Sequence, residues 1–263
     1  MIASIYSYIF SRGLFRNLND RIISLALRAR GYNNYGSNTK SGESFFIEKI
    51  LAPTNPKLCI DVGANIGGYS NEILSKTGAN VICFEPLPMA YQELKKIVSH
   101  NNGRVKCENM GIGNAVGELV IHFNPDALGH ASFSEDVKKV SYVTNELQAT
   151  VPVITLDSYC EDNKITAIDL VKIDTEGFEA EVFEGAVKTF ANIKPKFIQI
   201  EFNWHQLFRQ TSLNYFAEQL KGYEVYQLIP SGWVKRDPRD PLSNIFIFSN
   251  FVFVHKNVLE EDC

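Results

Sequence analysis

Apolar and polar positions along the chain alternate between strand-like and helix-like patterns. Short apolar runs at 58–62, 80–86 and 104–110 are typical of buried strands. The stretches between them, 67–76 and 89–100, have the three- and four-residue apolar spacing of helices. Because strands in such an order are joined by crossover helices, the pattern predicts an α/β fold with a mostly parallel, doubly wound sheet.

The alternation is interrupted after residue 110. Two apolar runs at 117–123 and 149–156 predict extra strands, and the polar segment 124–139 lies between them. We interpret these residues as a β insertion, and an insertion of this kind commonly carries substrate contacts.

Beyond the insertion the strand–helix order resumes. Further strands are predicted at 167–174, 195–203, 223–229 and 244–256, and we expect the last to enter the sheet as a final, antiparallel strand. Helices are predicted at 177–190 and 212–222. The first of these would bury one apolar face, made of Phe178, Val182, Phe183, Ala186, Val187 and Phe190.

Composition and charge exclude some classes of protein. Hydrophobic residues make up 45% of the chain and charged residues 21%, as in ordinary globular proteins. The net charge of -4 argues against a general nucleic-acid binder, which is normally basic. Five cysteines cannot form a complete disulfide set, and Cys59, Cys83 and Cys107 fall within predicted strands as buried free thiols. We therefore expect a reducing, cytoplasmic location.

The N-terminal residues differ from the rest. Residues 1–35 contain five arginines and one acid, and we expect neither a membrane span nor a signal peptide there. A basic helix can rest on a membrane surface, or it can pack on the main domain or on another subunit of a homo-oligomer, which we favour. We divide the chain into a helical extension at 1–41, a main domain at 42–256 and a tail at 257–263.

The turn after the first predicted strand suggests a ligand. Ligands of doubly wound sheets bind at the carboxyl ends of the strands, and the chain turns there through Gly63, Gly67 and Gly68. The dinucleotide fingerprint G-x-G-x-x-G needs a glycine where this chain has Asn65. The order G-x-x-x-G-G is therefore a different turn, which argues against a nicotinamide-dependent oxidoreductase.

Two acids refine this interpretation. Asp61 precedes the turn, where a carboxylate can attract an ammonium group, and Glu85 ends the second strand, where a carboxylate can take both hydroxyls of a ribose. A ligand with an adenosine and a positive charge suits this pair of acids better than a pyrophosphate does.

These residues resemble a known family. DVGANIGGYS followed by FEP is similar to the cofactor half of S-adenosylmethionine-dependent methyltransferases, and ITLDSY followed by DLVKIDTEGFEAEVFEGA resembles the FkbM family. The resemblance covers residues 42–255. It implies a class I, Rossmann-like fold with a doubly wound, seven-stranded sheet, to which we add the N-terminal helical extension that the resemblance does not cover. It also implies methyl transfer to a hydroxyl of a sugar, polysaccharide or glycosylated natural product.

The resemblance also assigns residues to the cofactor, S-adenosyl-L-methionine. The residues around its methionine part would be Asp61, Gly63, Asn65, Gly67 and Tyr69. Glu85 would bind the ribose, and the adenine would lie near Asn109, Met110 and Gly111.

A hydroxyl acceptor must lose its proton during methyl transfer. A carboxylate or a histidine can take it, and a metal can lower its pKa. The ends of two predicted strands bring four candidates to one edge of the sheet: Asp174, Glu176, Glu201 and His205. Either one of them is the general base, or the three acids hold a divalent cation such as Mg²⁺. Asp174 and Glu176 can also act as caps of the following helix.

Acceptor contacts are expected in the insertion, from His130, Ser132 and Phe133. Trp204, Tyr226 and Trp233 lie near predicted strand ends, where they can stack on a sugar ring or pack in the core. An alternative is an interaction protein that kept the fold and lost the chemistry. Such a protein would show damaged motifs, whereas DVGANIGGYS, FEP and KIDTEG are intact here.

Overall fold

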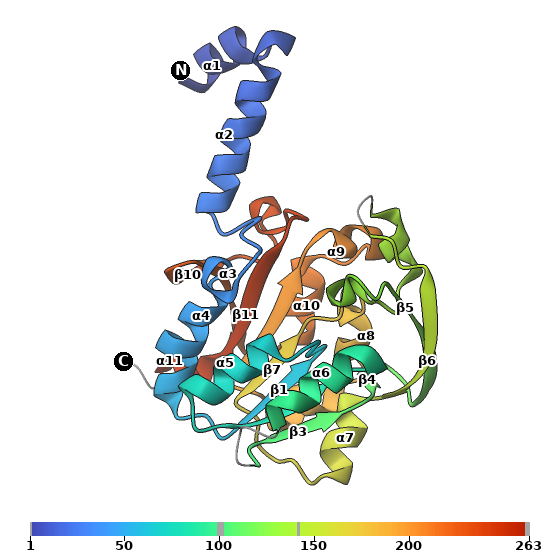
Figure 1. Cartoon of the computed structure of the whole chain (residues 1–263). Helices are drawn as coiled ribbons and strands as arrows, with labels where there is room; N and C mark the ends of the chain where they lie inside the picture. The colour runs from blue at the N-terminus through green and yellow to red at the C-terminus, as the bar shows by residue number, and fades with distance from the viewer. Residues whose placement is uncertain (1, 99–102, 141–142, 261–263) are drawn as a thin grey trace.

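Eight strands form the central sheet of the protein, in the order β10-β9-β11-β8-β7-β1-β2-β3 (Figure 1). The structure is a computed structural model that describes residues 2–98, 103–140 and 143–260. The strands are β1 Leu58–Val62, β2 Asn80–Phe84, β3 Val105–Glu108, β7 Leu170–Ile173, β8 Phe197–Phe202, β9 Tyr223–Ile229, β10 Gly232–Arg236 and β11 Ser249–His255. Strands β3, β2, β1, β7 and β8 pair in parallel, and β11 runs antiparallel to both β8 and β9. The prediction of a mostly parallel sheet with a final antiparallel strand is confirmed.

Helices cover both faces of this sheet. In β1, Ile60 and Val62 belong to one apolar cluster and Cys59 to another, because alternate side chains of a strand point to opposite faces. The helices that contribute to the cluster of Cys59 are α5 Gly68–Lys76, α6 Pro88–Val98 and the π-helical turn η2 Phe46–Leu51. Those that contribute to the other cluster are α7 Leu156–Asp162, α8 Glu179–Glu184, η6 Thr189–Ile193 and α10 Leu213–Gln219.

The predicted insertion is a small second sheet at the carboxyl end of the central strands. Its strands are β4 Gly111–Ile112, β5 Gly117–Phe123 and β6 Leu147–Ile154, in the order β4-β6-β5. Ile121, Phe123 and Val151 from this sheet pack on Leu87 and Ala90, which lead into α6. This contact holds the connection between β5 and β6 beside the end of β2. The connection contains two short helices, η4 Leu128–His130 and η5 Glu135–Lys139.

Short helices surround this body, and a helical arm leaves it. Near the body lie α3 Asn38–Ser41, α4 Glu43–Phe45, η3 Ala52–Thr54, α9 Trp204–Arg209, η7 Pro241–Ser243 and α11 Lys256–Glu260. The arm consists of α1 Ile2–Phe10, η1 Gly13–Phe15 and α2 Arg16–Ala29, and Figure 1 shows it projecting away from the sheet. No described helix combines the length and the apolar character that crossing a bilayer requires.

The structure differs from the sequence-based expectation in three places. Strand β10 adds an eighth strand beyond the expected seven, as a hairpin with β9 across a tight turn. The predicted strand at 244–256 begins only at Ser249. The helix predicted at 177–190 is broken, and its Val187 is 57% exposed. Asp157 explains the break, since its carboxylate accepts the backbone N–H groups of Lys188 and Thr189 and starts a new helical turn there.

Several smaller expectations can be compared with the described residues. Cys59 and Cys83 are buried free thiols, and Cys107 is a half-buried one. Residues 99–100 of the helix predicted at 89–100 and residues 261–263 of the predicted tail lie outside the described residues. The domain boundary at 41/42 stays a prediction, although Tyr32 already lies in the apolar core.

Candidate active site

The turn after β1 is built by residues with positive φ. Gly63 has a φ of +82°, and a Cβ atom there would lie 1.8 Å from the backbone oxygen of Asp174 at the end of β7. Asn65 also has a positive φ, of 47°, and Gly67, with a φ of 85°, precedes α5. The ends of β1 and β7 meet in direct backbone contact, so only glycine can occupy the position of Gly63.

Glu85, at the end of β2, holds this turn in place. Its Oε2 accepts the N–H of Asn65 at 2.8 Å, and its Oε1 accepts the N–H of Leu87 at 2.8 Å. Burial raises the pKa of Glu85 to about 7, although both backbone hydrogen bonds oppose this rise. A carboxylate oxygen has two lone pairs, so each oxygen of Glu85 can accept one further hydrogen bond.

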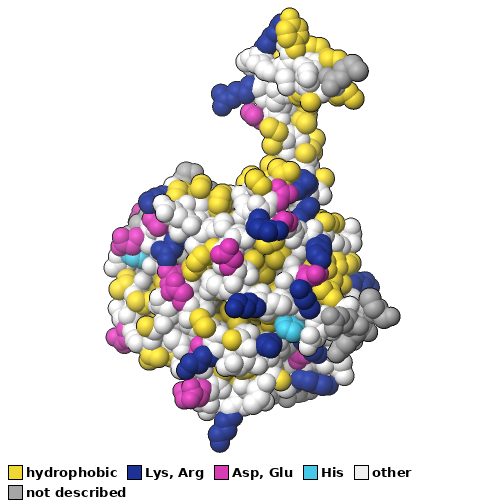
Figure 2. Space-filling view, turned by 180° about the vertical axis from the view of Figure 1, so that it is seen from behind, with side chains coloured by type: hydrophobic (Ala, Val, Ile, Leu, Met, Phe, Trp, Pro, Cys, Tyr) yellow, Lys and Arg dark blue, Asp and Glu magenta, His cyan; other side chains and the backbone are white. Residues whose placement is uncertain are grey.

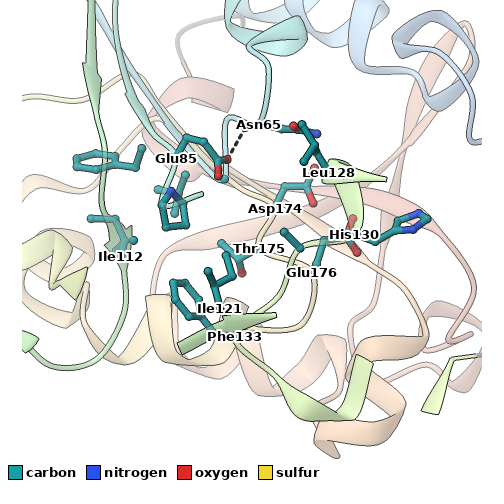
Figure 3. A pocket seen from close by; sticks show the side chains of 17 residues that line it. Asn65, Glu85, Ile112, Ile121, Leu128, His130, Phe133, Asp174, Thr175 and Glu176 are labelled. Atoms are coloured by element: carbon teal, nitrogen blue, oxygen red, sulfur yellow. Dashed lines mark hydrogen bonds between the residues drawn. The ribbon is translucent and has the colours of Figure 1, made fainter. Parts of the chain in front are cut away.

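A first cavity of about 320 Å³ opens between this turn and the insertion (Figure 3). Its volume falls within the range of small-molecule sites, about 300–1,000 Å³. In Figure 3, Glu85 and Asn65 lie at one side, Phe133 and Ile121 at another, and the carboxylates of Asp174 and Glu176 face the same space. The cavity therefore combines an apolar wall with three carboxylates that follow the ends of β2 and β7.

The predicted cofactor residues divide into two groups. Those that line the first cavity are Gly63, Asn65, Glu85 and Gly111. Asp61, Gly67, Tyr69, Asn109 and Met110 do not line it. Asn109 donates to the backbone oxygens of Glu85 and Pro86 and so positions that loop, and Met110 packs against the apolar core. Gly67 stands at the beginning of α5.

Asp61 and Tyr69 lie instead at a side cavity of about 220 Å³ that shares Gly63, Asn65 and Asp174 with the first cavity. Ser70 donates to Asp61 at 2.6 Å, and Tyr69 donates to Gln199 at 2.6 Å. Burial raises the pKa of Asp61.

A buried lysine that the sequence analysis did not single out stands beside this side cavity. Lys172 on β7 is 5% exposed, and its ammonium group donates to Asp174 Oδ2 at 2.8 Å. Burial alone would lower the pKa of Lys172, but Asp174, Asp61 and Glu43 outweigh it and raise the pKa above its ordinary value. One buried cation thus interacts with three carboxylates.

Glu176 forms a pair with His205 on α9. Its Oε2 lies 2.9 Å from His205 Nε2, and Gly177, with a φ of 100°, lets the chain pass against the imidazole ring. Burial raises the pKa of Glu176, against the hydrogen bond to His205. Burial alone would lower the pKa of His205, but Glu176 raises it overall. A raised pKa makes the carboxylate of Glu176 a stronger base than an exposed glutamate.

Glu201 completes a group of three acids. Ligand atoms of Asp174, Glu176 and Glu201 lie within 4.8 Å of one another, and such oxygen donors suit Mg²⁺. Each acid already has a protein partner, because Lys172 and His205 bind the first two and Asn203 Nδ2 donates to Glu201 Oε1 at 2.6 Å. The use of a cation by this group stays a prediction.

A second cavity of about 650 Å³ lies on the other side of Glu176. It shares only Glu176 and His130 with the first cavity. Its aromatic wall consists of Tyr35, Trp204, Phe246 and Phe248, and its polar groups include Asn33, Glu201, Asn203 and His205. The arrangement offers one space for a cofactor, an adjoining space for an acceptor, and a carboxylate between them.

The residues expected to contact the acceptor lie in three different places. His130 lines both cavities, and Phe133 lines only the first, where it packs beside Gly111. Ser132 is buried and donates to the backbone oxygen of Glu176 at 2.7 Å, so it holds the loop that carries this acid. Among the candidate aromatics, Trp204 lines the second cavity, whereas Tyr226 and Trp233 stack on each other at 4.4 Å in the β9–β10 hairpin.

The chain is similar to a known protein family and to several known methyltransferases. A family model described as the methyltransferase FkbM domain matches residues 61–225. The hexuronic acid methyltransferase AglP of Haloferax volcanii is 29% identical over 140 residues, which are 53% of this chain and 54% of that protein. The 2-O-methyltransferase NoeI of Sinorhizobium fredii is 25% identical over 199 residues, 71% of this chain and 79% of that protein.

A further relative matches over a smaller share of this chain, and a solved structure aligns with low sequence identity. The methyltransferase sdnD of Sordaria araneosa is 29% identical over 161 residues, 51% of this chain and 61% of that protein. The matched regions thus span 54% and 61% of the lengths of AglP and sdnD. The solved O-methyltransferase from Bacillus cereus in complex with SAH aligns at a TM-score of 0.44 with 12% identity, over 96% of both chains.

The family match covers the parts of the chain that build the first cavity. It includes the glycine turn, Glu85, the insertion and the segment from Asp174 to His205, and it extends over more than half of the 263 residues. The protein therefore belongs to the FkbM methyltransferase domain family.

Proposed function

We propose that the protein is an S-adenosylmethionine-dependent O-methyltransferase whose acceptor is a hydroxyl of a sugar or a glycosylated molecule. One observation carries the proposal: Glu176 stands between two adjoining cavities and lines both of them. Methyl transfer needs a donor site and an acceptor site that meet at a single point, with a proton acceptor there.

The first cavity suits the cofactor. The ribose would approach Glu85, whose oxygens keep free lone pairs, and the adenine would lie against the apolar wall that includes Phe133 and Ile112. The methionine part would extend toward Asp174 and the side cavity, where Asp61 can attract its ammonium group. The cofactor supplies a methyl group on a positively charged sulfur.

At the junction, Glu176 would receive the proton of the acceptor hydroxyl while the oxygen forms its bond to the methyl carbon. The carbon–sulfur bond breaks in the same step, so S-adenosylhomocysteine, the methyl ether and a protonated Glu176 result. His205 would hold the carboxylate in position and share the proton through the 2.9 Å contact. Asp174 lines both the first cavity and the side cavity, and it would stay paired with Lys172 beside the methionine part of the cofactor.

The acceptor class rests on two supports. Two relatives are a hexuronic acid methyltransferase and a 2-O-methyltransferase. The second cavity combines four aromatic side chains with carboxylate and amide groups, and such walls stack on sugar rings while polar groups bind the hydroxyls.

Two other functions are less well supported. A nicotinamide-dependent oxidoreductase would need the close backbone approach of a second glycine, whereas Asn65 fills that position and donates its N–H to Glu85. An interaction protein without chemistry would not need a proton acceptor between two cavities.

Calorimetric titration of the purified protein with S-adenosylmethionine, and with NAD⁺ in parallel, tests the first step. We expect micromolar binding of S-adenosylmethionine and none of NAD⁺. Methyl transfer from labelled cofactor to a panel of uronic acids and neutral sugars then tests the acceptor class. Repeating the assay after chelation and after adding back Mg²⁺ separates the two mechanisms, since rescue by Mg²⁺ would assign a cation to Asp174, Glu176 and Glu201. Binding of NAD⁺ alone would overturn the proposal.

A further inference from the structure

The N-terminal arm, α1 to α2, takes no part in the proposed function, yet its surface is unusual. No described residue of α1 or α2 is buried. Side chains that soluble proteins normally cover are open here: Ile2 is 86% exposed, Tyr8 80%, Leu14 87% and Leu25 69%. Figure 2 shows apolar side chains at several places along the arm, beside basic and acidic ones. An exposed apolar surface of this kind marks an interaction site.

The arm has its own internal structure. The hydroxyl of Tyr6 donates to Asn19 Oδ1 at 2.6 Å, and Asn19 Nδ2 donates to the backbone oxygen of Phe10. The rings of Tyr6 and Phe10 stack at 4.7 Å, and Phe15 packs edge-on against Phe10. These contacts fold α1 against the beginning of α2.

Charge separates the arm from the rest of the chain. Residues 1–35 contain five arginines and a single acid, Asp20. The whole chain has 26 basic and 30 acidic side chains, so the remainder has 21 basic and 29 acidic ones. The arm is therefore positive on a protein that is otherwise negative.

We infer that the arm binds the surface of an anionic membrane, with its apolar side chains in the interface and its arginines on the lipid headgroups. Apolar and tyrosine side chains beside arginines are the combination that such surfaces select. A second copy of the chain fits less well. A symmetric contact would bring the same patch of both copies together and place two sets of four arginines side by side, Arg12, Arg16, Arg21 and Arg28 of each copy.

The base of the arm is joined to the second cavity. Leu27 packs against the apolar core, and the N–H of Asn33 donates to the backbone oxygen of Phe248 at 2.7 Å. Asn33, Tyr35 and Phe248 all line the second cavity. A bound arm thus holds this cavity close to the lipid surface. That the second cavity receives an acceptor near the membrane rests on the proposed function, whereas the membrane binding of the arm does not.

Sedimentation of the full chain with vesicles tests the inference. We expect binding to vesicles of phosphatidylcholine with phosphatidylglycerol, weak binding to phosphatidylcholine alone, and release by salt. The variant Ile5→Glu/Ile23→Glu, at positions 54% and 56% exposed, should lose binding. Its matched control is Val116→Glu/Val187→Glu, at positions 69% and 57% exposed on the body, which adds the same charge and should bind like the wild type.

A second pair of variants isolates the charge. Arg16→Gln/Arg21→Gln should weaken binding to the anionic vesicles by roughly tenfold or more, because each basic side chain near such a surface contributes about fivefold. Lys57→Gln/Lys221→Gln, two exposed lysines on the body, should leave it unchanged.

Two results would overturn the inference. One is failure of the wild type to bind either vesicle, together with a dimer in light scattering that Ile5→Glu/Ile23→Glu dissociates. The other is equal loss of binding in the arm variants and in their controls. Calorimetric binding of S-adenosylmethionine by the same variants keeps this test separate from the proposed function, since the arm lines neither the first cavity nor the side cavity.

Discussion

The two cavities on either side of Glu176 are built in different ways. Backbone geometry shapes the first, through the positive φ of Gly63 and Asn65 and the two N–H groups that Glu85 accepts. Side chains from six segments shape the second, at 33–35, 130, 143, 176, 201–205 and 246–248. A wall made of backbone accepts little variation, whereas a wall made of aromatic side chains can be changed one residue at a time. We expect the first cavity to hold an invariant cofactor and the second to determine the acceptor.

Replacement of the group between the cavities should have the largest effect. Glu176→Gln keeps the shape of the side chain but cannot take a proton, so turnover should fall by about 100- to 10,000-fold, the range for general acid–base groups. Calorimetry should show unchanged cofactor binding. Glu184→Gln, on the exposed side of α8, is the control and should retain full turnover. Normal turnover in Glu176→Gln would assign the proton transfer to another group.

Two glycines of one turn test how strictly backbone shapes the first cavity. Gly63→Ala should lower the free energy of unfolding by at least about 2 kcal/mol, because a strained φ costs about 1–3 kcal/mol and the new Cβ meets the Asp174 oxygen. Gly68→Ala is the matched control, since nothing lies within 4 Å of its Cβ position and alanine favours the helix by up to about 1 kcal/mol. Denaturant unfolding measures both, and equal stability of the two variants would contradict the backbone contact.

The pH dependence of cofactor binding tests Glu85. Its pKa of about 7 lies above the ordinary value, so the folded protein carries a proton on this group below that pH. A carboxylate that accepts ribose hydroxyls must be ionised, and the dissociation constant of S-adenosylmethionine should therefore rise about tenfold for each pH unit below 7. Above pH 7 it should be flat. For the variant Glu85→Gln, calorimetry should show cofactor binding weaker by about 1.5–3 kcal/mol. The dissociation constant of this variant should not change with pH below 7. A slope that survives in the variant would belong to another group.

The smallest effect is expected in the second cavity. Trp204→Ala should raise the KM for a sugar acceptor by about two- to tenfold, the value of one aromatic contact, with little change in kcat. Trp233→Ala is the control, because the only other tryptophan lies outside both cavities. Each variant leaves one tryptophan, so acceptor should quench the fluorescence of Trp233→Ala and not that of Trp204→Ala. The opposite pattern would place the acceptor elsewhere.

The same contrast explains what the sequence could predict. The glycine turn and Glu85 are adjacent to strand ends, and strand ends of a parallel sheet meet at one edge, so local pattern was enough to bring them together. Glu176 and His205 were expected at that edge for the same reason, and they are 2.9 Å apart. Lys172 lies in a predicted strand, and the strand pattern does not indicate that Asp174, Asp61 and the distant Glu43 surround its buried ammonium group.

The second cavity had no comparable signal. Tyr35 lies in the expected N-terminal extension and Phe248 in a predicted strand, and only the tertiary fold brings them to Trp204. For Asn109 and Ser132 the sequence predicts the place in the fold but not the bonding partner. Their position near the site was anticipated, but both bind backbone groups of the loops beside it, which no spacing rule indicates.

The contact between Gly63 and Asp174 has a practical consequence for engineering this protein. The turn after β1 and the end of β7 are more than a hundred residues apart in the sequence, yet neither can change its path without displacing the other. A chimera that exchanges only the N-terminal half with a homologue would combine the turn after β1 of one protein with the end of β7 of another, and their backbones would not match at this contact. Recombination should therefore carry both segments as one unit, while the aromatic residues around the acceptor are diversified freely.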